Sequence, residues 1–232
     1  LAHRRLSIID LSSAADQQWA TKMHDDLLDA VDWAVKTNVT RKEDVAIMGG
    51  SYGGYATLVG LTFTPDAFKC GVDIVGPSNL ETLLASIPPY WETERASLYR
   101  SVGNPTTPEG KAFLESRSPL FKADAITAPL LIGQGAHDPR VNVSESDRIA
   151  AALEAKKVPV TYVLFPDEGH GFARPENNLA FFAIAEEFLS HCVGGRAEPI
   201  GNALNASTAI VKTGADYVPD LPQALADRPP AK

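Results

Sequence analysis

One serine lies in a run of glycines where its hydroxyl could act as a nucleophile. The run is Gly49-Gly50-Ser51-Tyr52-Gly53-Gly54, which contains the pattern Gly-x-Ser-x-Gly. A serine hydroxyl attacks a carbonyl carbon well only when a base takes its proton. Because an apolar run (45–49) precedes the serine and a helical pattern (55–63) follows it, the context favours a nucleophile elbow over a phosphate-binding or packing turn. The elbow predicts an exposed Ser51 and a Tyr52 N–H directed at a developing oxyanion.

His170 is the candidate base for this serine. It lies in Asp167-Glu168-Gly169-His170-Gly171-Phe172, just after a predicted strand at 159–165. The flanking glycines permit a tight loop, and the position fits the order serine, acid, histidine that accompanies such an elbow. The alternative is a histidine in a surface loop. The other histidines fit less well: two precede the serine, one adjoins the candidate acid, and one falls late in the last predicted helix (His3, His24, His137 and His191).

Asp138 is the candidate acid that would orient the His170 ring and stabilise its imidazolium form. It lies in the segment 135–141 (Gly-Ala-His-Asp-Pro-Arg-Val), at the carboxyl end of a predicted strand at 129–135. Asp167 and Glu168 are too close to His170 in sequence to approach it well, and Asp124 precedes the strand. The alternative for Asp138 is a carboxylate that caps its own loop.

Three further residues could contact a substrate. Arg140, two residues past Asp138, is predicted to donate to a substrate carbonyl, with a solvated loop arginine or an ion pair as the alternative. Tyr90 and Trp91 lie in a Pro-rich segment (77–121) that we expect to be irregular. They could line a pocket over the serine, and local packing explains them equally well.

Alternating strand and helix patterns predict the α/β class. Besides the strands above, residues 68–75 form an apolar strand pattern, and helical patterns cover 14–37, 146–156 and 178–192. This alternation predicts a mostly parallel sheet with helices on both faces. Ligand sites in such sheets lie at the carboxyl ends of the strands, where Ser51, Asp138 and His170 are expected.

Composition excludes some classes of function. The net charge of −8 over 232 residues argues against a nucleic-acid partner, and no apolar run is long enough to span a membrane. Cys70 and Cys192 are expected to be two separate buried thiols, with a disulfide as the less favoured alternative. No metal or other cofactor is expected, and the sequence indicates neither compartment nor oligomeric state.

Residues 15–200 resemble the catalytic domain of the prolyl oligopeptidase family, nearest its acylaminoacyl-peptidase and dipeptidyl-peptidase-like branch. The resemblance implies an α/β-hydrolase fold and hydrolysis of short peptides. It implies a triad of Ser51, Asp138 and His170, an oxyanion donor at Tyr52, an Arg140 that holds a peptide carbonyl, and a Val141 that borders the specificity pocket. The matching stretches are 19–26, 49–55, 116–120, 135–141 and 168–172.

Two features of that family have no match here: an N-terminal β-propeller, and a His-Gly-Gly-Pro loop that supplies a second oxyanion donor. The sequence is therefore expected to be an N-terminally truncated α/β-hydrolase. A carboxylesterase on the same triad and an inactive fragment stay open as alternatives to an active peptidase.

The two ends of the chain differ from the central domain. Residues 1–12 resemble a segment of the glutamine-hydrolysing domain of asparagine synthetases, without that domain's nucleophilic cysteine. We expect an unrelated segment at 1–13, the catalytic domain at 14–200 and a C-terminal extension at 201–232. The Pro- and Ala-rich composition of the extension predicts poor order from about residue 213.

Overall fold

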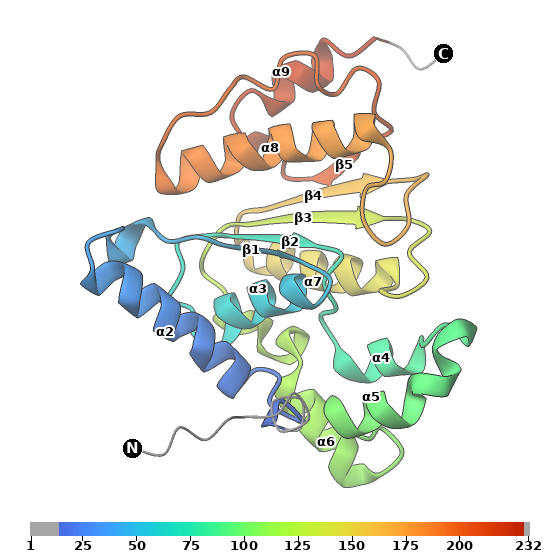
Figure 1. Ribbon diagram of the computed structural model, residues 1–232. Helices are drawn as coiled ribbons and strands as arrows, with labels where there is room; N and C mark the ends of the chain where they lie inside the picture. Colours follow the sequence, from blue (N-terminus) through green and yellow to red (C-terminus); the bar gives the residue numbers. More distant parts are fainter. Residues whose placement is uncertain (1–13, 230–232) are drawn as a thin grey trace.

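The computed structural model describes residues 14–229, which contain a five-stranded sheet in the order β1-β2-β3-β4-β5 (Figure 1). Strands β1 (Ile47–Gly50), β2 (Gly71–Ile74), β3 (Leu130–Gly135) and β4 (Val160–Phe165) run parallel. Strand β5 (Ile210–Thr213) pairs antiparallel with β4. The predicted α/β class with a mostly parallel sheet is confirmed. The segment at 1–13 lies outside the described residues.

Helices cover both faces of the sheet, as expected. Helices α3 (Tyr52–Phe63) and α7 (Val143–Lys156) lie on one face and α8 (Pro175–Val193) on the other, and α2 (Lys22–Lys36) lies beside α3 (Figure 1). Alternate strand residues face opposite sides, so Leu130 and Ile132 join the buried cluster of α3 and α7, whereas Leu131 and Val163 join that of α8. None of the described helices has the length and apolar character needed to span a membrane.

Two predictions between residues 14 and 121 are wrong, one in the extent of a helix and one in the kind of structure. The helix predicted at 14–37 begins only at Lys22, because Gln17 and Ala20 have positive φ values of 58° and 57°. The segment predicted to be irregular is helical. It contains α4 (Leu80–Ala85), a 3₁₀ helix (Pro89–Glu94), α5 (Arg95–Ser101), α6 (Pro108–Arg117) and a second 3₁₀ helix (Pro119–Ala125).

The prolines explain why this segment looked irregular. Pro89, Pro108 and Pro119 each occupy the first residue of a helix. At that position the missing N–H costs nothing, because the first N–H groups of a helix have no partner within it. Prolines in this stretch therefore start short helices instead of excluding them.

The expected poor order of the chain from about residue 213 is wrong. Strand β5 extends the sheet, and helix α9 (Leu221–Ala226) packs on the α8 side (Figure 1). Val218 and Leu221 are fully buried there, in the same apolar cluster as Phe181. These few apolar side chains are spaced irregularly among prolines and alanines, so they form no sequence pattern. Together they complete the apolar cluster around α8.

The expectation of two separate buried thiols is also wrong. Cys70 and Cys192 form a disulfide, with Cα atoms 6.5 Å apart. The bond joins the residue before β2 to the last turn of α8. The two cysteines are 122 residues apart in sequence, so only the packing of α8 on the sheet brings them together.

Candidate active site

Ser51 lies in a sharp turn between β1 and α3. Its backbone has φ 59° and ψ −116°, a strained conformation for a residue with a side chain. The turn needs glycine at two neighbouring positions. A Cβ at Gly49 would approach the carbonyl carbon of Gly53 to 2.5 Å, and a Cβ at Gly54 would overlap the carboxylate of Asp73. A Cβ at Gly53 would meet nothing within 4 Å. The predicted elbow therefore forms, but not every glycine of its pattern is required.

The side chains of Ser51, His170 and Asp138 form a continuous chain of hydrogen bonds. Ser51 Oγ lies 2.8 Å from His170 Nε2, and His170 Nδ1 lies 2.8 Å from Asp138 Oδ2. The Asp138 side chain is fully buried and that of His170 is 14% exposed. The three residues follow β1, β4 and β3 respectively, at the carboxyl ends of the strands. The structure thus brings together the three residues that the sequence singled out.

Backbone donors hold the Asp138 carboxylate in place. Its Oδ1 accepts hydrogen bonds from the N–H groups of Arg140, at 2.8 Å, and Val141, at 2.9 Å. These bonds fix the orientation of the carboxylate and leave Oδ2 for His170. The loop-capping role that was the alternative for Asp138 therefore coexists with the contact to His170.

Glu168 organises the loop of His170 instead of competing with Asp138. It is 3% exposed, and its carboxylate accepts from the N–H groups of Ala173 and Arg174, both at 2.9 Å. It also accepts from the Asn177 side chain at 2.8 Å. Glu168 thereby folds the loop back onto the start of α8. The hydrogen bonds from the N–H groups five and six residues later to Glu168 follow no sequence pattern, so the sequence could not predict them.

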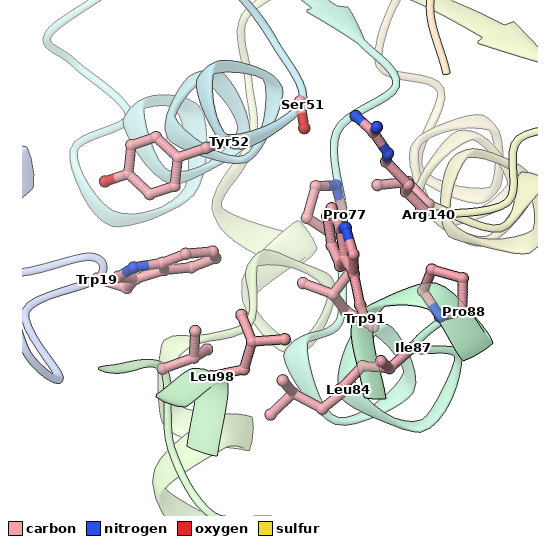
Figure 2. Close-up of a pocket in the computed structure, with 13 residues that line it drawn as sticks. Trp19, Ser51, Tyr52, Pro77, Leu84, Ile87, Pro88, Trp91, Leu98 and Arg140 are labelled. Atoms are coloured by element: carbon pink, nitrogen blue, oxygen red, sulfur yellow. The ribbon is translucent and has the colours of Figure 1, made fainter. Parts of the chain in front are cut away.

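An apolar cavity of about 230 Å³ opens beside Ser51 (Figure 2). The predicted residues Trp91, Arg140 and Val141 line it, and the Arg140 guanidinium lies 5.2 Å from the centroid of the Trp91 ring. Tyr90 does not line the cavity: it is 57% exposed and packs edge-on against Trp91. The remaining lining residues are Trp19, Tyr52, Pro77, Leu83, Leu84, Ile87, Pro88, Leu98 and Val102.

Trp19 is a cavity residue that the sequence analysis missed. The pattern placed it on the buried stripe of a helix, whereas it precedes α2 and packs against Tyr52 and Tyr55, with ring centroids 4.7 and 5.0 Å away. The available signal was its place in the stretch 19–26, one of those that carry the resemblance to the prolyl oligopeptidase family. The apolar residues of α4 and α5 were missed because their segment looked irregular.

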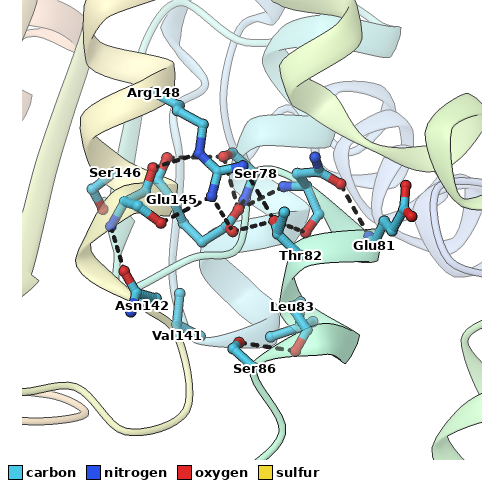
Figure 3. Close-up of polar contacts among 12 residues, drawn as sticks. Ser78, Glu81, Thr82, Leu83, Ser86, Val141, Asn142, Glu145, Ser146 and Arg148 are labelled. Carbon is cyan, nitrogen blue, oxygen red and sulfur yellow. Dashed lines mark hydrogen bonds and ion pairs between the residues drawn. The ribbon is translucent and has the colours of Figure 1, made fainter. Parts of the chain in front are cut away.

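A buried carboxylate attaches the cavity wall to α7 (Figure 3). Glu145, 1% exposed, accepts from the N–H groups of Ser78, at 3.0 Å, and Asn79, at 2.8 Å. Arg148 donates to it at 3.1 Å, and the Thr82 hydroxyl also binds it. Glu145 stands three residues after the N-cap Asn142, the spacing of a capping box, yet its side chain binds the neighbouring loop. It thereby positions α4, which carries Leu83 and Leu84.

A second buried acid lies beneath the elbow. Asp73 is fully buried, its Oδ1 accepts from the Gly76 N–H at 2.9 Å, and its Oδ2 has no partner among the described residues. Burial raises the pKa of Asp73 to about 7, because the low-polarity surroundings disfavour the charged form. Nearer the cavity, burial also raises the pKa of the Tyr52 hydroxyl.

Several known proteins are similar to this chain in sequence, in fold or in both. Dipeptidyl aminopeptidase BIII of Pseudoxanthomonas mexicana is 64% identical over 93% of the chain, and dipeptidyl peptidase family member 6 of Caenorhabditis elegans is 52% identical over 87%. A puromycin-hydrolyzing peptidase of Mycobacterium tuberculosis superposes over 80% of the chain with a TM-score of 0.73 and 31% identity. Pyrococcus horikoshii acylaminoacyl peptidase superposes over 82% with a TM-score of 0.72 and 24% identity, and shows the shared fold.

The chain spans less than a third of the length of these proteins: 31% and 27% of the two sequence relatives, and 28% and 30% of the two structures. Residues 10–196 match the model of a family described as the prolyl oligopeptidase family. Together with the elbow, the sheet and the structural neighbours, this match shows that the chain has an α/β-hydrolase fold and belongs to the prolyl oligopeptidase family.

Proposed function

We propose that this chain is the catalytic part of a serine peptidase that hydrolyses short peptides. The observation that carries the proposal is the pair of 2.8 Å contacts that link Ser51, His170 and Asp138. Three loops far apart in sequence supply these residues, in the chain order serine, acid, histidine that is typical of this fold. The relatives named dipeptidyl aminopeptidase and dipeptidyl peptidase support peptides as the substrate class.

The proposed reaction proceeds through an acyl-enzyme. Ser51 Oγ attacks the carbonyl carbon of the scissile bond while its proton moves to His170 Nε2. His170 then gives this proton to the leaving amine, and the acyl group stays on Ser51. A water molecule attacks the acyl carbon, His170 takes the water's proton, and return of that proton to Ser51 Oγ releases the acid. Asp138 holds the ring and stabilises the imidazolium in both halves of the reaction.

The backbone N–H of Tyr52 is the proposed oxyanion donor. Tyr52 is the first residue of α3, so its N–H has no acceptor within the helix. The N-terminus of a helix also carries a partial positive charge, which favours a negative oxygen at this point. One such donor typically contributes about 2.7–4 kcal/mol of transition-state stabilisation.

The apolar cavity is the proposed binding place for the substrate side chain next to the scissile bond. Its walls come from Trp19, Trp91, Val141 and the apolar residues of α4 and α5. The Arg140 side chain reaches toward Ser51 above this cavity (Figure 2). We propose that its guanidinium donates to a peptide carbonyl while the apolar walls exclude charged side chains.

Labelling with a fluorophosphonate, which reacts with activated serines, tests the proposal directly. We expect the chain to label, Ser51→Ala to remove labelling, and Ser116→Ala, at an exposed serine, to leave it unchanged. Labelling of Ser51→Ala at the rate of the parent chain would overturn the assignment. Peptide anilides and small acyl esters then separate the activities, because turnover of esters alone would favour a carboxylesterase.

A further inference from the structure

The loop that carries His170 is held from behind by a buried amide. Asn177, in the first turn of α8, is fully buried. Its Nδ2 donates to Glu168 at 2.8 Å and to Asp167 at 3.1 Å, and its Oδ1 accepts from the N–H of Thr208 at 2.8 Å and from the Thr208 hydroxyl at 3.2 Å. Both N–H donors of Asn177 are thus used and its oxygen accepts from the Thr208 backbone, whereas the Thr208 hydroxyl, with one proton, is shared between Asn177 and Asp167.

Thr208 belongs to the C-terminal extension, beyond residue 196 where the match to the family model ends. Its hydroxyl also binds Asp167. The extension itself is anchored on both sides of Thr208. The Arg228 guanidinium donates to the carbonyl oxygen of Ala209 at 2.6 Å and binds that of Ser207, and β5 pairs with β4. Thr208 is thus a fixed point against which the histidine loop can rest.

The histidine loop needs such support. Gly169 and Gly171 flank His170, and Gly171 has a φ of 107°, so the backbone here has little intrinsic stiffness. Two neighbouring carboxylates, Asp167 and Glu168, share the Asn177 amide. Hydrogen bonds from Thr208, Arg174 and Asn177 lower the pKa of Asp167 and keep it charged. Without the amide, the side chains of Asp167 and Glu168 would lose the donor that they share.

We propose that the C-terminal extension positions His170, with Asn177 and Thr208 as the positioning residues that connect the extension to the histidine loop. The inference rests on the proposed function, since it gives His170 the role of base. Neither residue touches the reacting atoms. Both act through Glu168 and Asp167, which set the course of the loop toward Ser51.

The variants that test this are Asn177→Ala, Thr208→Val and Thr208→Ser. Thr208→Val removes the hydroxyl but keeps the backbone donor, and it serves if Asn177→Ala fails to fold. Thr208→Ser restores the hydroxyl. Asn202→Ala, at an exposed asparagine of the same extension, is the matched control. Each 232-residue variant is labelled with the fluorophosphonate, and the labelling rate is normalised to the number of sites that react at the end point, which removes the effect of misfolded molecules.

A second measurement does not depend on catalysis. The N–H groups of Ala173 and Arg174 both donate to Glu168, so their hydrogen exchange reports the state of the loop.

We expect Asn177→Ala to label at least about tenfold more slowly per site, because small displacements of a catalytic group cost large factors in rate. Thr208→Val should show a smaller loss and Thr208→Ser parent-like rates. Exchange at 173 and 174 should accelerate while that of β3 stays unchanged.

The outcomes separate this inference from the proposed function. If the parent chain labels but Asn177→Ala and Thr208→Val label at its rate per site, with unchanged exchange, the positioning role is overturned and the peptidase assignment stands. If the parent chain does not label although loop exchange responds, the peptidase assignment fails. The contacts are then structural only, which also overturns the positioning role.

Discussion

The N–H of His137 donates a hydrogen bond to the carbonyl oxygen of Glu168 at 2.9 Å. His137 precedes Asp138 and Glu168 lies two residues before His170, so this bond joins the loop of the proposed acid to the loop of the proposed base. The two loops are therefore aligned by their backbones, independently of the contact between Asp138 and His170. This bond limits how far the two loops can separate, while the course of the His170 loop beyond Glu168 depends on further contacts.

This close approach makes Gly135 essential. A Cβ at Gly135 would overlap the carbonyl oxygen of Gly169 and approach that of Glu168 to 2.7 Å. We expect Gly135→Ala to push the loops apart and to lower the fluorophosphonate labelling rate by about 10²-fold. Gly169→Ala is the matched control, because its nearest new neighbour would lie 3.8 Å away. Equal rates for the two variants would show that the loop spacing is unimportant.

Asp138→Asn tests the orientation of the His170 ring. The amide can present an N–H where Oδ2 now accepts from His170, which favours the wrong tautomer of the base. We expect kcat on a peptide anilide to fall by about 10⁴-fold with little change in KM. Asp124→Asn, at an exposed aspartate with an ion pair to Lys156, should retain parent activity. A similar loss at Asp124 would contradict the choice of Asp138.

Glu145→Gln tests the attachment of the cavity wall. The new amide group would face the N–H donors of Ser78 and Asn79, which now bind a carboxylate. We expect the free energy of unfolding, measured with urea, to drop by about 2–3 kcal/mol. KM for substrates with a large apolar side chain should rise more than kcat falls, because α4 carries part of the cavity. Glu154→Gln, exposed on the same helix, is the control.

Asp73 predicts a specific pH dependence of stability. In the folded chain the pKa of Asp73 is about 7, whereas the pKa of an exposed aspartate is 3.8. Between these values the folded chain holds a proton that the unfolded chain has released. The contribution of Asp73 to stability therefore falls as the pH rises from about 4 to 7, by on the order of 4 kcal/mol, and is constant above.

Asp73→Asn removes this titration. We expect urea unfolding of the variant to lose less stability than the parent chain between about pH 5 and pH 8. Asp66→Asn, at an exposed aspartate, should keep the parent's pH dependence. Identical slopes for the parent chain and Asp73→Asn would mean that the Asp73 carboxyl does not carry a proton in the folded state.

The sequence by itself determined the fold class and the three residues that the hydrogen bonds beside the cavity connect. Ser51, Asp138 and His170 each follow an apolar strand pattern, and such patterns are local. Parallel strands place their carboxyl ends at one edge, so residues after different strands meet there. For Ser51 the flanking glycines added a second local signal, since the strained turn tolerates no Cβ at positions 49 and 54.

The tertiary structure alone decided the long-range contacts that hold these residues and the cavity wall in place. The Cys70–Cys192 disulfide, the 67-residue separation of Ser78 and Glu145, and the 31-residue separation of Asn177 and Thr208 have no local pattern. Such contacts depend on how a short helix or a tail packs on the sheet, and a few buried side chains decide that. Tyr90 and Trp91 show the difference most simply. Adjacent in sequence and similar in chemistry, they point to different places, and only Trp91 lines the cavity.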